Sequence, residues 1–148
     1  MAGLTSMKFN EDEMQSVLSE QLLPGETLCA AIYCNFSDTG FLASRVPVCG
    51  YLGITDRDRL IACQAHLTGT QFLTADLNFA KKLTVKTPLL GSLFKQKEVY
   101  AECLGERTVK LKFTVIRKVT GKKFPNQSEN AETLLRLIEE KQRQLGLN

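Results

Sequence analysis

The chain has 148 residues, of which 43% are hydrophobic and 24% charged, and its formal net charge is +3. This length and composition fit one ordinary domain, and no apolar run approaches the roughly 18 residues of a membrane span. The first fourteen residues turn acidic and lack the long apolar core of a secretory signal, so we expect a cytoplasmic protein.

Residues 10–22 read as a short helix that begins with its own capping signal. Asn10 is the expected N-cap and Glu13 its capping-box partner, while the acidic first turn suits the positive end of the helix. An apolar stripe at helical spacing follows, formed by Met14, Val17, Leu18 and Leu22. We interpret residues 1–21 as an N-terminal helical extension, and residues 22–148 as the main domain.

From Thr27 the apolar period changes from helical to alternating, which predicts strands. In the first, one face should carry Leu28, Ala30, Ile32, Cys34 and Phe36. In the last, Val109, Leu111, Phe113 and Val115 should point inward, with Lys110 and Lys112 outward. The seven predicted strands span residues 27–36, 46–54, 59–65, 72–79, 83–87, 95–104 and 107–116.

Four alternating charges, Asp56, Arg57, Asp58 and Arg59, separate the second and third predicted strands. Paired carboxylates invite a catalytic or metal-binding interpretation. Aspartates also tolerate turn geometry and accept hydrogen bonds from nearby backbone amides. We therefore favour the tip of a hairpin over a catalytic pair.

The chain ends in a predicted amphipathic helix over residues 131–146. Its apolar face carries Leu134, Leu137, Ile138 and Leu145, and Gly146 is a typical C-terminal stop. Asn126 with Glu129, or alternatively Ser128, would cap its start. The fold class is thus mainly β with α: a partly open seven-stranded antiparallel barrel that is capped by this helix.

The order of elements resembles the pleckstrin-homology (PH) superfold, and more specifically the bacterial PH domains, including the YokE-like group. The matching stretches are "LLPGETLCAAI", "GYLGITDRDRLIAC" and "NAETLLRLIEE", and the hairpin motif of that family falls on Leu52, Thr55, Arg59, Leu60 and Ile61. The likeness covers about residues 22–143. It implies a non-enzymatic interaction module that binds a protein partner or self-assembles.

The residues themselves favour neither catalysis nor a cofactor. Five cysteines form no CxxC pair and read as reduced apolar fillers, and a zinc site needs more ligands than one histidine and scattered thiols supply. His66, the only histidine, has no orienting partner nearby in the sequence and reads as a strand-end residue. We expect no enzyme, no metal and no cofactor.

Charge is distributed unevenly along the chain. Residues 1–80 carry four basic and nine acidic side chains, whereas residues 81–123 carry twelve and three. One interpretation of this basic segment is a solvated strand face on which Lys110 and Lys112 protect an edge strand. The alternative is attraction to an acidic protein or an anionic membrane surface. Nucleic acid is disfavoured, because few aromatic residues are interleaved with the lysines for base stacking.

The strongest candidate binding surface is the stretch "KTPLLGSLFKQK", residues 86–97. It places apolar side chains in a bend, flanked by lysines, and apolar patches rimmed by polar groups mark contacts with partners or membranes. The candidate site residues are Lys86, Leu89, Leu90, Leu93, Phe94, Lys95 and Lys97.

Overall fold

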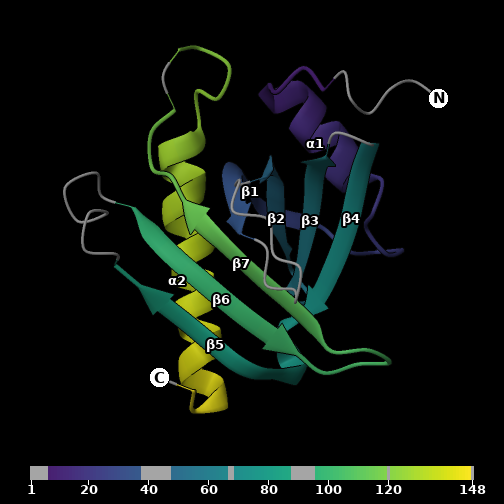
Figure 1. The fold of residues 1–148 in the computed structure, drawn as a ribbon, viewed down its shortest axis with the longest axis vertical. Coiled ribbons are helices and arrows are strands. Elements are labelled where there is room, and N and C mark those ends of the chain that lie inside the picture. The colour runs from purple at the N-terminus through teal and green to yellow at the C-terminus, as the bar shows by residue number, and fades with distance from the viewer. Residues whose placement is uncertain (1–6, 38–47, 67–68, 88–95, 120, 148) are drawn as a thin grey trace.

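In the described part of the chain, a curled antiparallel sheet is flanked by two helices (Figure 1). The computed structural model describes residues 7–37, 48–66, 69–87, 96–119 and 121–147. Its strands are β1 (Leu28–Ser37), β2 (Val48–Thr55), β3 (Arg59–His66), β4 (Gly69–Asp76), β5 (Ala80–Lys86), β6 (Lys97–Cys103) and β7 (Val109–Val115). The helices are α1 (Glu11–Ser19), the 3-10 turn η2 (Leu77–Phe79) and α2 (Gln127–Leu145).

The strand order is β4-β3-β2-β1-β7-β6-β5, so β4 and β5 are the two outer strands of the sheet. The sheet bends between β1 and β7 into two halves, and their inner faces enclose the main core with α2. The large side chains at its centre include Phe36, Leu52 and Phe113, each at most 1% exposed. This arrangement confirms the predicted fold class, a PH-like, partly open seven-stranded barrel capped by a C-terminal helix.

A bulge in β1 corrects one prediction. Leu28 pairs with Thr55 while Ala30 pairs with Ile54, so the register shifts between them. Because an extra residue reverses the alternation of side chains, Leu28 does not share the inner face with Ala30 and the residues beyond it. It packs instead in a second apolar cluster on the outer face.

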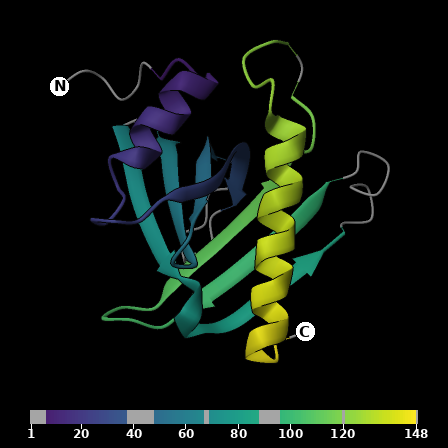
Figure 2. The ribbon, with the colours of Figure 1, turned by 180° about the vertical axis from the view of Figure 1, so that it is seen from behind.

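That outer cluster lies between α1 and the first half of the sheet, and Figure 2 shows α1 in front of these strands. Met14 and Leu18 of α1 are 1% and 0% exposed, as the apolar stripe predicted. Gly53 permits this contact: a Cβ there would lie 2.6 Å from Leu28 Cδ1 and 3.1 Å from Leu18 Cδ1. The helix therefore sits directly on the backbone of β2.

The residues predicted to cap α1 make hydrogen bonds beyond those of a capping box. Asn10 accepts a hydrogen bond from the Glu13 backbone as expected, but the Glu13 carboxylate accepts from the Lys8 and Phe9 amides and from the Tyr51 hydroxyl. The helix α2 begins at Gln127, four residues earlier than predicted, and Gly146 ends it in the left-handed conformation at φ 68°.

Gln127, the first residue of α2, fills the point where β1 and β7 separate. Its amide nitrogen donates to the carbonyl oxygens of Tyr33 and Ile116 at 2.8 and 2.7 Å, and its amide oxygen accepts from the Tyr33 backbone at 3.0 Å. Gln127 is 3% exposed. Backbone groups left without a strand partner where β1 and β7 separate are thus satisfied by a side chain from the helix.

Candidate functional site

The sequence-predicted surface at residues 86–97 is described only at its ends. Leu89, Leu90, Leu93, Phe94 and Lys95 lie outside the described residues, so their assignment stays a prediction. Lys86 is exposed at the end of β5. Lys97 begins β6, is half-buried and donates from Nζ to Thr87 Oγ1 at 2.7 Å.

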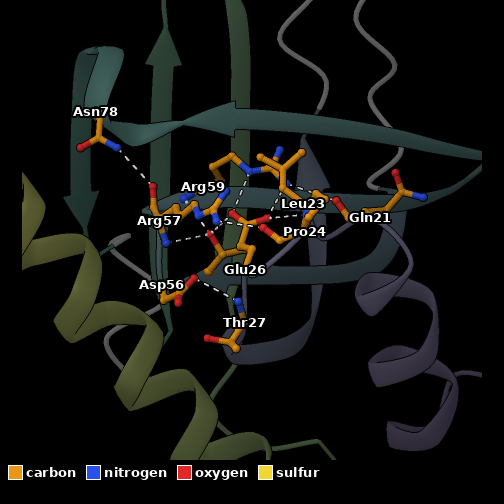
Figure 3. Close-up of polar contacts among 10 residues, drawn as sticks. Gln21, Leu23, Pro24, Glu26, Thr27, Asp56, Arg57, Arg59 and Asn78 are labelled. Atoms are coloured by element: carbon orange, nitrogen blue, oxygen red, sulfur yellow. Dashed lines mark hydrogen bonds and ion pairs between the residues drawn. The ribbon is translucent and has the colours of Figure 1, made fainter.

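The charged stretch of residues 56–59 is the tip of the β2–β3 hairpin, as predicted, and it carries a buried ion pair (Figure 3). Arg59 donates to both oxygens of Glu26, from Nε at 3.0 Å and from Nη2 at 2.9 Å. The Glu26 carboxylate also accepts from Thr55 Oγ1 at 2.6 Å and from the Leu23 amide at 2.9 Å. Its side chain is fully buried, and the side chain of Arg59 is 15% exposed.

These contacts keep Glu26 ionised. The hydrogen bonds from Arg59 outweigh the burial that opposes ionisation, and with those from Leu23 and Thr55 they lower the pKa of Glu26 to about 2. Every oxygen of the carboxylate is occupied by protein donors. The arrangement fixes the segment between α1 and β1 against the sheet.

The same hairpin tip also connects to η2 and α2. The Asp58 carbonyl accepts from the Leu77 amide at 2.8 Å, and its carboxylate pairs with Lys141 Nζ at 3.0 Å. Asp58 has φ 60°, the left-handed conformation that aspartate tolerates in tight turns. Asp56 Oδ1 accepts from the Thr27 amide at 3.0 Å. The carboxylates of this cluster therefore serve the structure.

A different surface gathers the basic segment. On the outer face of β5, β6 and β7, three rows of side chains run across the strands, and in the described part of the chain no helix packs over them (Figure 1). We call this surface the lysine face. The rows are Lys82–Glu102–Lys110, Thr84–Tyr100–Lys112 and Lys86–Glu98–Thr114, and Lys81 lies beside the first.

Two glutamates and a tyrosine interrupt the positive charge of the lysine face. Lys112 and Glu98 approach to 3.7 Å, as do Lys81 and Glu102. The Tyr100 hydroxyl donates to Glu102 at 2.9 Å, and burial together with this bond raises the pKa of Tyr100. The face therefore carries both charges around a central aromatic ring, with Glu98 half-buried and Glu102 buried.

One interpretation of these lysines was wrong. Strand β7 lies between β1 and β6, inside the sheet, so Lys110 and Lys112 do not protect an edge. Their outward orientation was correct: Lys110 is exposed and the Lys112 side chain is 38% exposed. The lysines sit instead on an open face.

An exposed apolar pair adjoins this face. Phe79 and Leu104 are 61% and 53% exposed, the highest values among the large apolar side chains of the described residues. The Leu104 amide donates to the Phe79 carbonyl at 2.9 Å, which extends the β5–β6 pairing by one step. Lys81 and Lys82 follow Phe79 after one residue, Ala80, so apolar and basic side chains meet at this corner. Sequence reasoning missed the pair.

The five cysteines and the histidine all lie on strands of the sheet. All five thiols are free, and burial raises the pKa of Cys63 to about 12 and that of Cys103 to about 11. His66 ends β3, with Nε2 3.1 Å from Gln64 Oε1. Within residues 7–37, 48–66, 69–87, 96–119 and 121–147, no three of the histidine, cysteine, aspartate and glutamate side chains are placed to hold a metal ion.

These features define a PH-like domain with an open, patterned lysine face. No protein-family model matches the chain, and no curated protein matches it either. Neither helix among the described residues combines the length and apolar content needed to cross a membrane.

The buried ion pair generates a pH prediction. Since the pKa of Glu26 is lowered in the fold, its contribution to the free energy of unfolding is complete above its ordinary pKa of about 4.5 and is lost as the pH falls toward about 2. Glu26→Gln should cost about 3 kcal/mol at pH 7, because it leaves Arg59 partly buried without its counter-charge. Urea unfolding from pH 7 to pH 2 measures both effects.

The exposed Glu106 supplies the matched control. Glu106→Gln should leave the unfolding midpoint close to wild type at pH 7, and its loss of stability below pH 4.5 should parallel that of the wild type. Glu26→Gln should instead show a shallower dependence over the same range. Equal slopes for Glu26→Gln and wild type would contradict the role of this carboxylate.

Proposed function

We propose that the protein is a non-catalytic interaction module, similar to bacterial PH domains of the YokE-like group, that acts in the cytoplasm and binds a protein partner or another copy of itself. The observation that carries the proposal is the lysine face. The opposite half of the sheet packs its outer face against α1, whereas among the described residues no helix packs over the outer face of β5–β7.

The charge pattern of the lysine face favours a protein over a uniform anionic surface. Five lysines attract negative charge, but Glu98 and Glu102 stand among them at fixed positions. A partner with matching carboxylates and a few basic groups satisfies both signs, and such complementarity gives specificity. Tyr100, half-buried at the centre, belongs to a residue type that is enriched in protein interfaces.

Charge reversal tests this surface. Poly-L-glutamate is a defined acidic probe, and we expect the wild type to bind it with an affinity that falls as salt increases. The variant Lys82→Glu/Lys110→Glu should lose this binding while its melting temperature stays near that of the wild type, since both side chains are exposed. Fluorescence anisotropy with labelled poly-L-glutamate, at several salt concentrations, provides the measurement.

The control is Lys122→Glu/Lys123→Glu, which changes the net charge equally at two exposed lysines away from the sheet. It should retain most of the binding. If both variants lose binding to the same extent, the attraction depends on net charge alone, and the lysine face is not the site.

A specific observation favours a second function, peripheral binding to an anionic membrane. Phe79 and Leu104 expose apolar surface next to Lys81 and Lys82. Peripheral proteins bind membranes through two weak contributions to the binding free energy. Apolar side chains insert between the lipids, and lysines attract the anionic headgroups.

Vesicle sedimentation separates this function from the first. If it holds, the wild type sediments with phosphatidylcholine vesicles that contain phosphatidylserine, and Phe79→Ser/Leu104→Ser stays in the supernatant. The chain has no tryptophan, so Phe79→Trp gives a single reporter whose emission should shift to the blue on insertion. Gln15→Trp, on the exposed side of α1, should show no shift. Wild-type protein that remains in the supernatant would contradict membrane binding.

The predicted surface at residues 86–97 remains part of the proposal. Leu90→Glu or Phe94→Glu should weaken self-association or vesicle binding more than it lowers the melting temperature. A large loss of melting temperature with association unchanged would instead assign these side chains to the core.

A further inference from the structure

The curled sheet has two outer strands, and they differ in how their open edges are protected. Strand β4 pairs with β3 and strand β5 with β6, and among the described residues neither has a second strand beside it. An outer strand presents backbone donors and acceptors to any extended chain that approaches, so folded proteins usually protect such strands with charge, proline or a covering element.

Strand β5 carries this protection. Its sequence, "AKKLTVK", includes Lys81, Lys82 and Lys86 among seven residues. In addition, α2 crosses it, and Gln142 Nε2 donates to the Leu83 carbonyl at 2.9 Å (Figure 2). A strand that paired with β5 would have to displace this hydrogen bond and part of the helix.

Among the described residues, strand β4 has no lysine and no packing contact with α2 like that of β5. Its sequence, "GTQFLTAD", has no charge before Asp76 and no proline. The Gln71 and Thr74 side chains are exposed, and Phe72 and Leu73 are only half-buried. A strand of eight residues whose first seven are uncharged, with apolar side chains at its centre, has the features that promote pairing between chains.

We propose that β4 pairs with β4 of a second copy, antiparallel about a two-fold axis, and so joins two seven-stranded sheets into one. The strand suits pairing with itself. An axis through Phe72 places the two Phe72 side chains opposite each other and Gln71 opposite Leu73, so no two charges of the same sign meet near the centre. Cross-strand aromatic and apolar pairs stabilise such a contact. Pairing about a two-fold axis also gives a closed dimer, which leaves no β4 edge free to add a third chain.

This inference rests on the self-association included in the proposed function and specifies its surface. It leaves the lysine face of each chain unoccupied, because that face belongs to the other half of the sheet. Dimerisation and binding of poly-L-glutamate are therefore separate measurements, and one can fail while the other succeeds.

The test is the concentration dependence of the mass of the full chain, measured by size-exclusion chromatography with light scattering. We expect wild-type protein to approach the mass of two chains. Gln71→Lys/Thr74→Lys places four lysines close to the proposed axis, so like charges should hold it at the mass of one chain. Both positions are exposed in the single chain, and circular dichroism should therefore show an unchanged melting temperature at low concentration.

Gln15→Lys/Ser19→Lys is the matched control, because it adds the same two charges on the exposed side of α1. It should remain dimeric. Hydrogen exchange at the β4 amides should slow as wild-type concentration rises, but not in the β4 variant.

Three results would overturn the proposal. A monomeric wild type would exclude the second copy as the occupant and would remove self-association from the proposed function, leaving poly-L-glutamate binding untouched. A β4 variant that stays dimeric would move the interface elsewhere. A series of larger species in place of a dimer would indicate pairing of β4 with β5 of the next copy.

Discussion

The buried pair of Glu26 and Arg59 is the constraint on which the arrangement of the other elements depends. Two charges removed from water are tolerated only where each finds several partners, and here the carboxylate has donors from a side chain, a hydroxyl and a backbone amide. This requirement brings the segment between α1 and β1 to the β2–β3 hairpin. The position of α1 on the sheet and the entry angle of β1 follow from it.

The two halves of the sheet show how one architecture acquires a covered and an open face. Small residues in β1 and β2, Ala31 and Gly53, let α1 approach the backbone, and the outer face there is apolar. On the other half, the corresponding positions carry lysine, glutamate, threonine and one tyrosine in register across three strands. An apolar helix gains nothing by packing on such a face, and in the described part of the chain none lies there.

Sequence reasoning predicted the elements because their signals are local. The helical stripe of Met14 and Leu18, the alternation of β7 and the stop at Gly146 each depend on residues close together in the chain. The β1 bulge was not predicted, because it arises from the pairing of Leu28 with Thr55, which is far away in sequence. The ion pair of Glu26 with Arg59 and the hydrogen bonds of Asn126 to Glu11 were not predicted for the same reason. Single-strand patterns likewise placed Lys110 outward, but only the strand order showed that β7 is not an edge.

Gln127 has a consequence for how α2 can move. Its side chain must meet both the donor and the acceptor of Tyr33 and also the carbonyl of Ile116. A helix that slid along its axis by one turn would carry this amide about 5.4 Å away, beyond the reach of any of the three bonds. The apolar face of α2 alone would tolerate such a slip, because its leucines repeat with the turn. The amide makes the docking position discrete, so α2 is either seated in this register or detached, with no graded series of positions between.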